Sequence, residues 1–158
     1  KIPPHKSAEV LASAEVRIEM CRKAADGFDK AEVCLIEFER QGKSYTYDTV
    51  LELKKRYPND KLSFVMGGDM LVYFDKWYKA DELMRLLSFI VFKRSDTDEK
   101  EFNSSIMRFR EMGMEIKVMD EIIPLVSSTE IRSDFKGKKE LLTPEIYEFL
   151  SERGVYGE

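Results

Sequence analysis

The sequence predicts an α/β protein, a doubly wound, Rossmann-like parallel sheet with helices on both faces. Short apolar runs typical of buried strands alternate along the chain with segments whose apolar residues recur at helical spacing. The chain has 158 residues, of which 43% are hydrophobic. This length suffices for one buried core and is too short for two ordinary domains, so residues 1–158 are predicted to form a single domain.

Turn and capping residues divide the chain into its elements. Ser13 is suited to cap the start of one helix, and Gln41-Gly42 to form a turn after a strand. Pro144 is suited to the first turn of a later helix and Gly154 to the end of that helix. In order, the predicted elements are a helix over 14–25, a strand over 31–38, a helix from Thr46 or Asp48 to Tyr57, a strand over 62–66, a helix over 79–87, a strand over 88–92, a helix over 98–111, an edge strand over 115–119, and helices over 128–135 and 144–153.

Charge and composition narrow the class of ligand. The formal net charge is −4 and the sequence pI about 5.3, so nothing in the overall balance favours nucleic acid or an anionic membrane as partner, and a small molecule is expected. Cys21 and Cys34 lie in apolar segments without metal-ligand spacing, which predicts buried, reduced thiols in a cytoplasmic protein. No apolar run is long enough to span a bilayer, and no secretory signal is recognisable.

The most informative stretch is Gly67-Gly68-Asp69, which ends an apolar strand and precedes Trp77-Tyr78. Glycines at the carboxyl end of a strand let a ligand approach the backbone, and open α/β sheets bind ligands at that edge. An aspartate can accept hydrogen bonds from sugar hydroxyls, and a tryptophan offers a flat face to an aromatic ring. This pattern indicates a nucleotide or aromatic-ring site. It is equally compatible with a purely structural role, in which the segment forms a strand, a turn, an acidic helix cap and a core tryptophan.

Two further segments place hydroxyl groups at predicted helix starts. In Ser127 to Arg132, free backbone N–H groups, Ser128, Thr129 and the Arg132 guanidinium are suited to an anion such as phosphate, although an ordinary cap with a solvated arginine has the same pattern. In Ser44 to Thr49, a carboxylate or phosphate site competes with a helix cap flanked by packing tyrosines.

The only histidine lies in Pro3-Pro4-His5-Lys6, where His5 and Lys6 are either phosphate contacts or exposed loop residues. The sequence contains no Walker-type loop, no HExxH, no GxSxG and no GxGxxG. These absences exclude the common signatures of phosphate loops, zinc proteases, serine hydrolases and dinucleotide folds.

The order of these segments resembles the bacterial nicotinate mononucleotide adenylyltransferases of the nucleotidyltransferase superfamily. The resemblance covers the whole chain and depends on the motifs Ile2-Pro3-Pro4-His5-Lys6, Ser44-Tyr45-Thr46, Gly68-Asp69, Trp77-Tyr78 and Ser127-Ser128-Thr129 with Ile131-Arg132. It implies a nucleotidyltransferase-type fold and a step of NAD synthesis. In that step the adenylyl group of ATP is transferred to nicotinate mononucleotide with Mg²⁺, giving deamido-NAD and pyrophosphate.

The resemblance also implies roles for residues. Thr46 and the backbone near Trp77 and Tyr78 would hold the nicotinate carboxylate, and Trp77 would stack on the pyridine ring. Asp69 would bind ribose, with Gly68 letting the ligand lie against the strand. The ATP phosphates would be bound by Ser128, Thr129 and Arg132. The mononucleotide phosphate would lie beside His5 and Lys6.

The chain departs from the family in one respect. Members open with a Gly-rich strand end and a His-x-Gly-His motif that contacts ATP phosphates, whereas this chain has one histidine. The N-terminal strand and helix are therefore expected to be missing from residues 1–158, and these residues alone are expected to be inactive in adenylyl transfer. The alternatives are a non-catalytic mononucleotide-binding module and a related transferase with another acceptor, such as nicotinamide mononucleotide or phosphopantetheine. A homo-oligomer is compatible with each.

Overall fold

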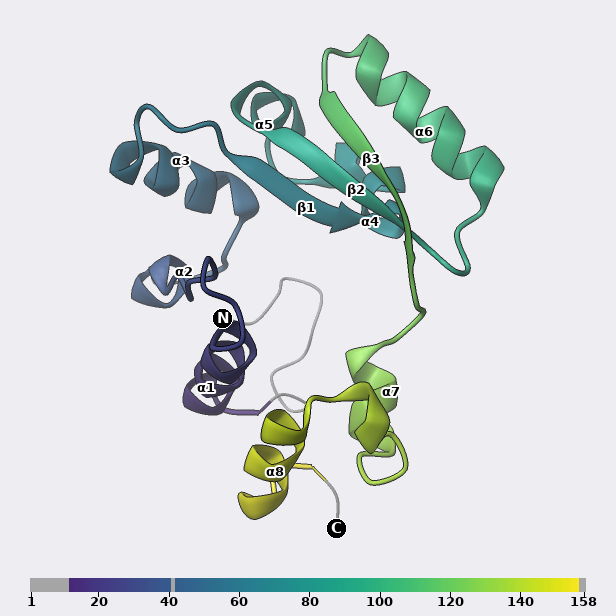
Figure 1. Cartoon of the computed structure of the whole chain (residues 1–158). Coiled ribbons are helices and arrows are strands. Elements are labelled where there is room, and N and C mark those ends of the chain that lie inside the picture. Colours follow the sequence, from purple (N-terminus) through teal and green to yellow (C-terminus); the bar gives the residue numbers. More distant parts are fainter. Residues whose placement is uncertain (1–11, 41, 157–158) are drawn as a thin grey trace. The chain divides into compact units, whose positions relative to one another are not determined.

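The structure is a computed structural model that describes residues 12–40 and 42–156. These residues form two compact units. The sheet unit is Tyr45–Leu125, and the flanking unit joins the chain up to Ser44 with the chain from Val126 onward (Figure 1). The single-domain organisation of the whole chain stays a prediction.

The sheet unit alternates helices and strands in the predicted order. Its elements are α3 (Thr46–Arg56), β1 (Ser63–Gly67), α4 (Gly68–Val72), the 3-10 helix η2 (Phe74–Lys76), α5 (Ala80–Leu86), β2 (Ser88–Arg94), α6 (Glu99–Glu111) and β3 (Glu115–Ile123). The helix α3 begins at Thr46 rather than at Asp48. Each predicted helix and strand of this unit is thereby confirmed.

The three described strands lie parallel in the order β1-β2-β3. Ser63 of β1 pairs with Ser88 of β2, which pairs with Glu115 of β3. Ile116 is buried between exposed neighbours, so β3 has the alternation expected of an edge strand, and it continues to Ile123 beyond the predicted end. Parallel strands flanked by helices confirm the predicted fold class.

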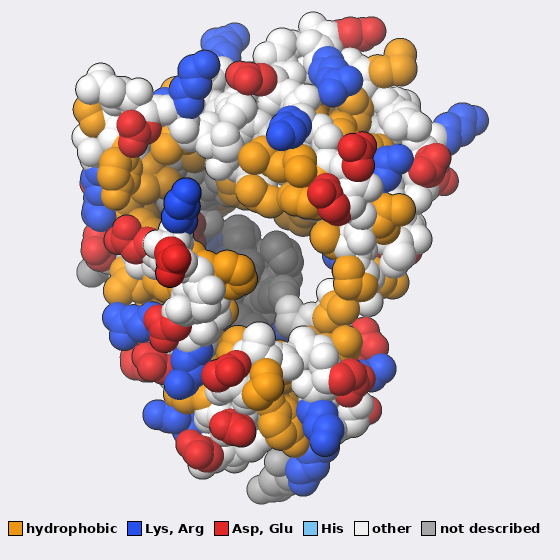
Figure 2. Space-filling model, in the orientation of Figure 1, with side chains coloured by type: hydrophobic (Ala, Val, Ile, Leu, Met, Phe, Trp, Pro, Cys, Tyr) orange, Lys and Arg blue, Asp and Glu red, His pale blue; other side chains and the backbone are white. Residues whose placement is uncertain are grey.

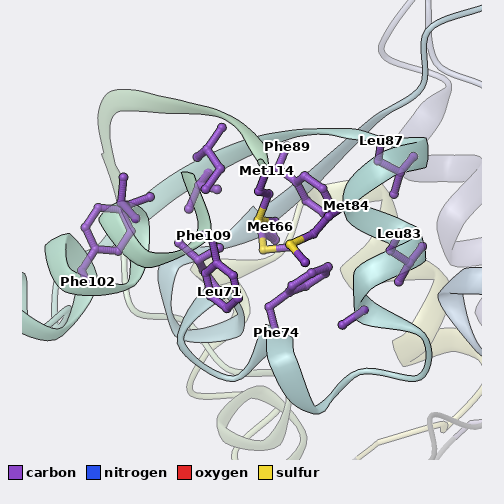
Figure 3. Close-up of a cluster of buried hydrophobic side chains, with 14 of the residues drawn as sticks. Met66, Leu71, Phe74, Leu83, Met84, Leu87, Phe89, Phe102, Phe109 and Met114 are labelled. Carbon is purple, nitrogen blue, oxygen red and sulfur yellow. The ribbon is translucent and has the colours of Figure 1, made fainter. Parts of the chain in front are cut away.

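The core of the sheet unit is formed by one face of the sheet and the helices packed on it (Figure 3). Met66, Phe89, Val91 and Ile116 alternate along their strands with residues of the other face, because successive strand residues point to opposite sides. Helices α4, α5 and α6 add their apolar stripes. The helical members of this core are Val50 of α3 and, from the other helices, Leu71, Phe74, Ala80, Leu83, Met84, Phe102, Ile106 and Phe109.

The flanking unit is helical in the residues that the structure describes. Its elements are α1 (Ala14–Ala25), α2 (Ile36–Glu39), α7 (Ser128–Ser133), the 3-10 helix η3 (Lys139–Leu141) and α8 (Pro144–Glu152). The Ser13 hydroxyl accepts a hydrogen bond from the Val16 amide at 3.3 Å, which confirms Ser13 as the cap of α1. Gly154 follows α8 with a φ of 57°, a left-handed conformation that glycine adopts without strain.

The predicted strand over residues 31–38 is wrong. Residues 31–35 have no regular structure, and the helical turn α2 follows. A strand needs a neighbour to pair its backbone groups, whereas a helical turn pairs them locally, as the Phe38 amide does with the Leu35 carbonyl at 2.8 Å. The turn also buries Ile36, which is 2% exposed, so a short apolar run identified a buried residue but not its secondary structure.

The predicted burial of the two cysteines is also wrong, because Cys21 and Cys34 are free and exposed. In α1, Val16 and Met20 pack against the apolar cluster of the flanking unit. Cys21 is one residue beyond Met20 and therefore points about 100° away from that face of the helix. Cys34 lies in the irregular segment before α2.

The surface has charged side chains of both signs. Basic and acidic groups are interspersed on the face that Figure 2 shows, in line with a net charge of −4. Within the part of the chain that the structure describes, no helix has the length and apolar character needed to cross a membrane. Cytoplasmic location stays a prediction.

Candidate functional site

The start of α3, which carries Thr46, lies beside Tyr78, although the two segments are far apart in the sequence. Thr46 is the first residue of α3, after the N-cap Tyr45, whose side chain makes no capping hydrogen bond. The Tyr78 ring lies 4.7 Å from the Tyr45 ring, centroid to centroid, and 6.0 Å from the Tyr47 ring, nearly perpendicular to it. The N–H groups of a first helical turn have no partner within the helix. The helix start that carries the Thr46 hydroxyl is therefore flanked by the rings of Tyr45, Tyr47 and Tyr78.

Trp77 lies at the margin of the core of the sheet unit. Its ring contacts Phe64 edge-on, with centroids 5.5 Å apart, and Phe74 at 5.2 Å. The indole is half-buried and packs against the core cluster. The described contacts therefore show Trp77 in a packing role. Its stacking on a pyridine ring stays a prediction.

Asp69 lies at the carboxyl end of β1, as the sequence predicts. One carboxylate oxygen turns back over Gly67, so that a Cβ atom on Gly67 would collide with it. The other oxygen is 3.5 Å from Nη1 of Arg94, the last residue of β2. Half of the Asp69 side chain is exposed, which leaves the carboxylate accessible to a ligand.

Gly68 has a packing reason in the structure. It is the buried first residue of α4, and a Cβ atom there would lie 2.8 Å from the Phe102 ring. Only glycine therefore lets α4 approach α6 this closely. The predicted contact of a ligand with the backbone at Gly68 stays a prediction.

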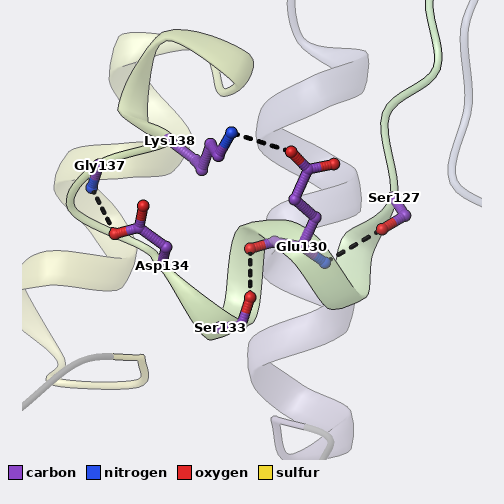
Figure 4. A network of polar contacts seen from close by, with 6 residues as sticks. All are labelled: Ser127, Glu130, Ser133, Asp134, Gly137 and Lys138. Atoms are coloured by element: carbon purple, nitrogen blue, oxygen red, sulfur yellow. Dashed lines mark hydrogen bonds and ion pairs between the residues drawn. The ribbon is translucent and has the colours of Figure 1, made fainter.

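Helix α7 begins with a capping contact (Figure 4). The Ser127 hydroxyl accepts a hydrogen bond from the Glu130 amide at 3.0 Å. The Glu130 carboxylate pairs with the Lys138 ammonium at 2.9 Å, and this hydrogen bond raises the pKa of Lys138 above its ordinary value. The loop after α7 is closed by the Gly137 amide, which donates to Asp134 Oδ1 at 3.1 Å. Ser127, rather than Ser128, is the cap.

The capping role of Ser127 leaves Ser128 and Thr129 in the first turn of α7. Arg132 Nη2 donates to Thr129 Oγ1 at 3.2 Å. The buried Arg132 Nε has no hydrogen-bond partner among the described residues. The predicted trio of Ser128, Thr129 and Arg132 thus lies within one helical turn, with a donor of the guanidinium still unused.

Lys79 is a residue that the sequence interpretation did not single out. Its ammonium lies 4.5 Å from the centroid of the Tyr47 ring and 5.8 Å from that of the Tyr78 ring. Partial desolvation lowers the pKa of this ammonium, but the facing Tyr47 and Tyr78 groups and Glu82 outweigh it, so that the pKa is raised. Lys79 is therefore positively charged at neutral pH. Its position directly after Trp77-Tyr78 is the signal that marks it.

The structure places the predicted site residues in two groups. Thr46, Gly68, Asp69, Trp77 and Tyr78 belong to the sheet unit, and Ser128, Thr129 and Arg132 belong to the flanking unit. His5 and Lys6 lie outside the described residues. Arg94, the partner of Asp69, was missed, although its place at the end of the neighbouring strand is a signal that sequence could have used.

Comparison with known proteins identifies the family of the chain. The model of the cytidylyltransferase-like family matches residues 1–134. A relative from Bacillus subtilis (strain 168), named nicotinate-nucleotide adenylyltransferase, is 38% identical over 163 residues, which cover 99% of this chain and 78% of the relative.

Two solved structures of Plasmodium falciparum nicotinic acid mononucleotide adenylyltransferase are similar in fold. The one complexed with APC has a TM-score of 0.71 and covers 92% of this chain and 77% of that protein, with 18% sequence identity. The one complexed with NaAD has a TM-score of 0.70 and covers 97% and 77%, again with 18% identity. At this identity the likeness supports the nucleotidyltransferase type of fold.

Proposed function

Because this chain belongs to the nicotinate-nucleotide adenylyltransferases of the cytidylyltransferase-like family, we propose that it acts in adenylyl transfer from ATP to nicotinate mononucleotide. The products are deamido-NAD and pyrophosphate, which makes the reaction a step of NAD synthesis. The observation on which this proposal depends most is that Tyr78 packs against the start of α3, through the Tyr45 and Tyr47 rings on either side of Thr46 in the sequence. We further propose that the protein is cytoplasmic and that its partners are these small molecules.

The sheet unit supplies the acceptor half of the proposed site. Thr46 and the backbone at Trp77 and Tyr78 bind the carboxylate of the pyridine ring, and Trp77 packs against the ring. Asp69 accepts hydrogen bonds from the ribose hydroxyls beside Gly68. The support is the helix start at Thr46, the exposed Tyr78 ring and the accessible Asp69 carboxylate. His5 and Lys6 are proposed to contact the mononucleotide phosphate.

The flanking unit supplies contacts for ATP. Ser128, Thr129 and Arg132 bind its phosphate oxygens through their hydroxyl, amide and guanidinium donors. The hydrogen bond from Arg132 to Thr129 supports this role because it holds the guanidinium over the first turn of α7. The unused Nε donor of Arg132 points to the same conclusion.

The chemistry requires no covalent intermediate with the protein. An oxygen of the nicotinate mononucleotide phosphate attacks the α-phosphorus of ATP, and the bond from that phosphorus to the pyrophosphate oxygen breaks. Catalysis then consists of holding the two phosphates in line and stabilising the negative charge that develops. The residues named above are proposed to bind one substrate in each unit: the mononucleotide in the sheet unit and ATP in the flanking unit.

A divalent cation accompanies ATP in phosphoryl-transfer enzymes, and we propose Mg²⁺ here. Within the residues that the structure describes, no group of three histidine, cysteine, aspartate or glutamate side chains is placed to hold a metal. The residues fit a cation that is bound mainly through the ATP phosphates and water, as Mg²⁺ commonly is. When bound, Mg²⁺ neutralises charge on the leaving pyrophosphate.

A second candidate is a mononucleotide-binding module without catalysis, and the single histidine of the chain favours it. We expect a purified polypeptide of these 158 residues to bind nicotinate mononucleotide and to release no pyrophosphate when ATP and Mg²⁺ are added. Calorimetric titration and a pyrophosphate-release assay measure the two properties separately.

The outcomes test both candidates. Binding without release is the expected result, and it agrees both with the module and with a transferase that needs a His-x-Gly-His motif for catalysis. Release of pyrophosphate supports the transferase and contradicts the expected need for a His-x-Gly-His motif. If nicotinate mononucleotide does not bind, both candidates are wrong for this polypeptide.

A further inference from the structure

Lys79 has an unusual backbone conformation. Its φ of 55° and ψ of 45° are left-handed, and it is the one non-glycine residue with a positive φ among the residues that the structure describes. This conformation is unfavourable for an L-residue with a Cβ atom and persists only where the surroundings impose it. Such outliers occur more often at functional sites than elsewhere.

The conformation accompanies a specific placement of the side chain. The ammonium of Lys79 lies over Tyr47 at 4.5 Å and near Tyr78 at 5.8 Å, each measured to the ring centroid. The Tyr45 ring completes the group by packing on Tyr78. We call these four residues the tyrosine–lysine cluster. A cation on aromatic faces is held in place while its remaining surface stays open to an anion.

The acidic neighbour of Lys79 does not neutralise it. Glu82 Oε1 is 4.0 Å from the Lys79 ammonium, at the limit of an ion pair, and both side chains are substantially exposed. Ion pairs with this geometry in water contribute little. The positive charge of the cluster is therefore available to a ligand.

The cluster surrounds the segment to which the proposed function assigns the pyridine carboxylate. Thr46 lies between Tyr45 and Tyr47, and Tyr78 precedes Lys79. We propose that Lys79 is a specificity-determining residue, whose ammonium favours a mononucleotide with a carboxylate on its aromatic ring over one with a carboxamide. This inference rests on the proposed function, because it concerns the same acceptor site.

The physical basis is charge. A carboxylate is attracted to the ammonium across a partly exposed site, whereas an uncharged carboxamide of the same shape is not. Removing the charge is therefore expected to weaken binding of the acid about tenfold, which corresponds to about 1.4 kcal/mol, and to leave binding of the amide unchanged. High salt should reduce the same preference in the unmodified chain, because it screens exposed charges.

The test is calorimetric titration of the full chain with nicotinate mononucleotide and, separately, with nicotinamide mononucleotide. In Lys79→Met the ratio of the two dissociation constants should fall about tenfold, and in Lys79→Arg it should be retained. Methionine has the same backbone cost as lysine in the left-handed conformation. Lys79→Asn provides a second neutral variant, because asparagine tolerates that conformation well.

Lys76→Met is the matched control. Lys76 also lies over a tyrosine, 4.9 Å from the Tyr73 ring centroid, but outside the cluster. Its replacement should leave the ratio unchanged. Loss of acid and amide binding to the same extent in Lys79→Met, or an unchanged ratio in both neutral variants, would overturn the inference while leaving the proposed function intact. If the unmodified chain does not prefer the acid, the proposed function and the inference both fail.

Discussion

Replacing Phe74 with alanine is expected to cost about 3–5 kcal/mol of the free energy of unfolding of the sheet unit. Phe74 is 0% exposed, and its ring contacts those of Trp77, Phe89 and Phe109 at 5.2, 5.1 and 5.7 Å between centroids (Figure 3). Truncation removes these contacts and leaves a cavity that rigid neighbours cannot fill. Urea unfolding, followed by the fluorescence of Trp77, measures the change.

The neighbouring aromatic residue provides the control. Tyr73 is 56% exposed, so Tyr73→Ala should change the free energy of unfolding by less than about 1 kcal/mol. Equal losses in the two variants would mean that Phe74 is not at the centre of the core. Because Trp77 contacts Phe74, the emission of Phe74→Ala should also shift to longer wavelength in the folded state.

Replacing Asp69 with asparagine is expected to weaken the binding of nicotinate mononucleotide by about 2–3 kcal/mol, which raises the dissociation constant about 30- to 150-fold. The substitution keeps the shape of the side chain and removes the charge that would accept hydrogen bonds from the ribose hydroxyls. Ribose is common to both mononucleotides. Binding of the acid and binding of the amide should therefore weaken by the same factor, whereas substitution of Lys79 is expected to weaken binding of the acid alone.

Asp75→Asn is matched to Asp69→Asn. Asp75 pairs with Arg108 at 3.4 Å, and Asp69 pairs with Arg94 at 3.5 Å, with similar exposure of both carboxylates. Both substitutions remove an exposed ion pair, which is worth little for stability. Only Asp69→Asn should affect binding. An Asp69→Asn variant that binds as tightly as the unmodified chain would show that ribose is bound elsewhere.

The order of most helices and strands was predictable in both units because the signals are local. Helical and strand periodicities, the cap at Ser13 and the proline at Pro144 act within a few residues of their own position. The segment 31–38 shows the limit of such signals. Its apolar residues indicate burial, but whether they form a strand depends on a pairing partner that local sequence does not specify.

The candidate site was predictable in its parts and not in its assembly. Asp69 follows a strand, so its place at the carboxyl edge of the sheet follows from the fold class. The packing of the Thr46 segment against Tyr78 depends on how α3 packs beside α5, which only the resemblance to a family anticipated. The left-handed conformation of Lys79 has no sequence signal at all, because lysine rarely adopts it.

The proposed acceptor is nicotinate mononucleotide, and Thr46 is the residue proposed to bind its carboxylate. Thr46→Val removes the hydroxyl and keeps the shape of the side chain. It should weaken binding of nicotinate mononucleotide about tenfold and binding of nicotinamide mononucleotide less, because a hydrogen bond to a charged carboxylate contributes more than one to a neutral carboxamide oxygen.

The most direct test is calorimetric titration of the unmodified chain with nicotinate mononucleotide, nicotinamide mononucleotide and phosphopantetheine in parallel. We expect the acid to bind at least about tenfold more tightly than the amide and phosphopantetheine not to bind. Equal binding of acid and amide, or preferential binding of phosphopantetheine, would contradict this expectation.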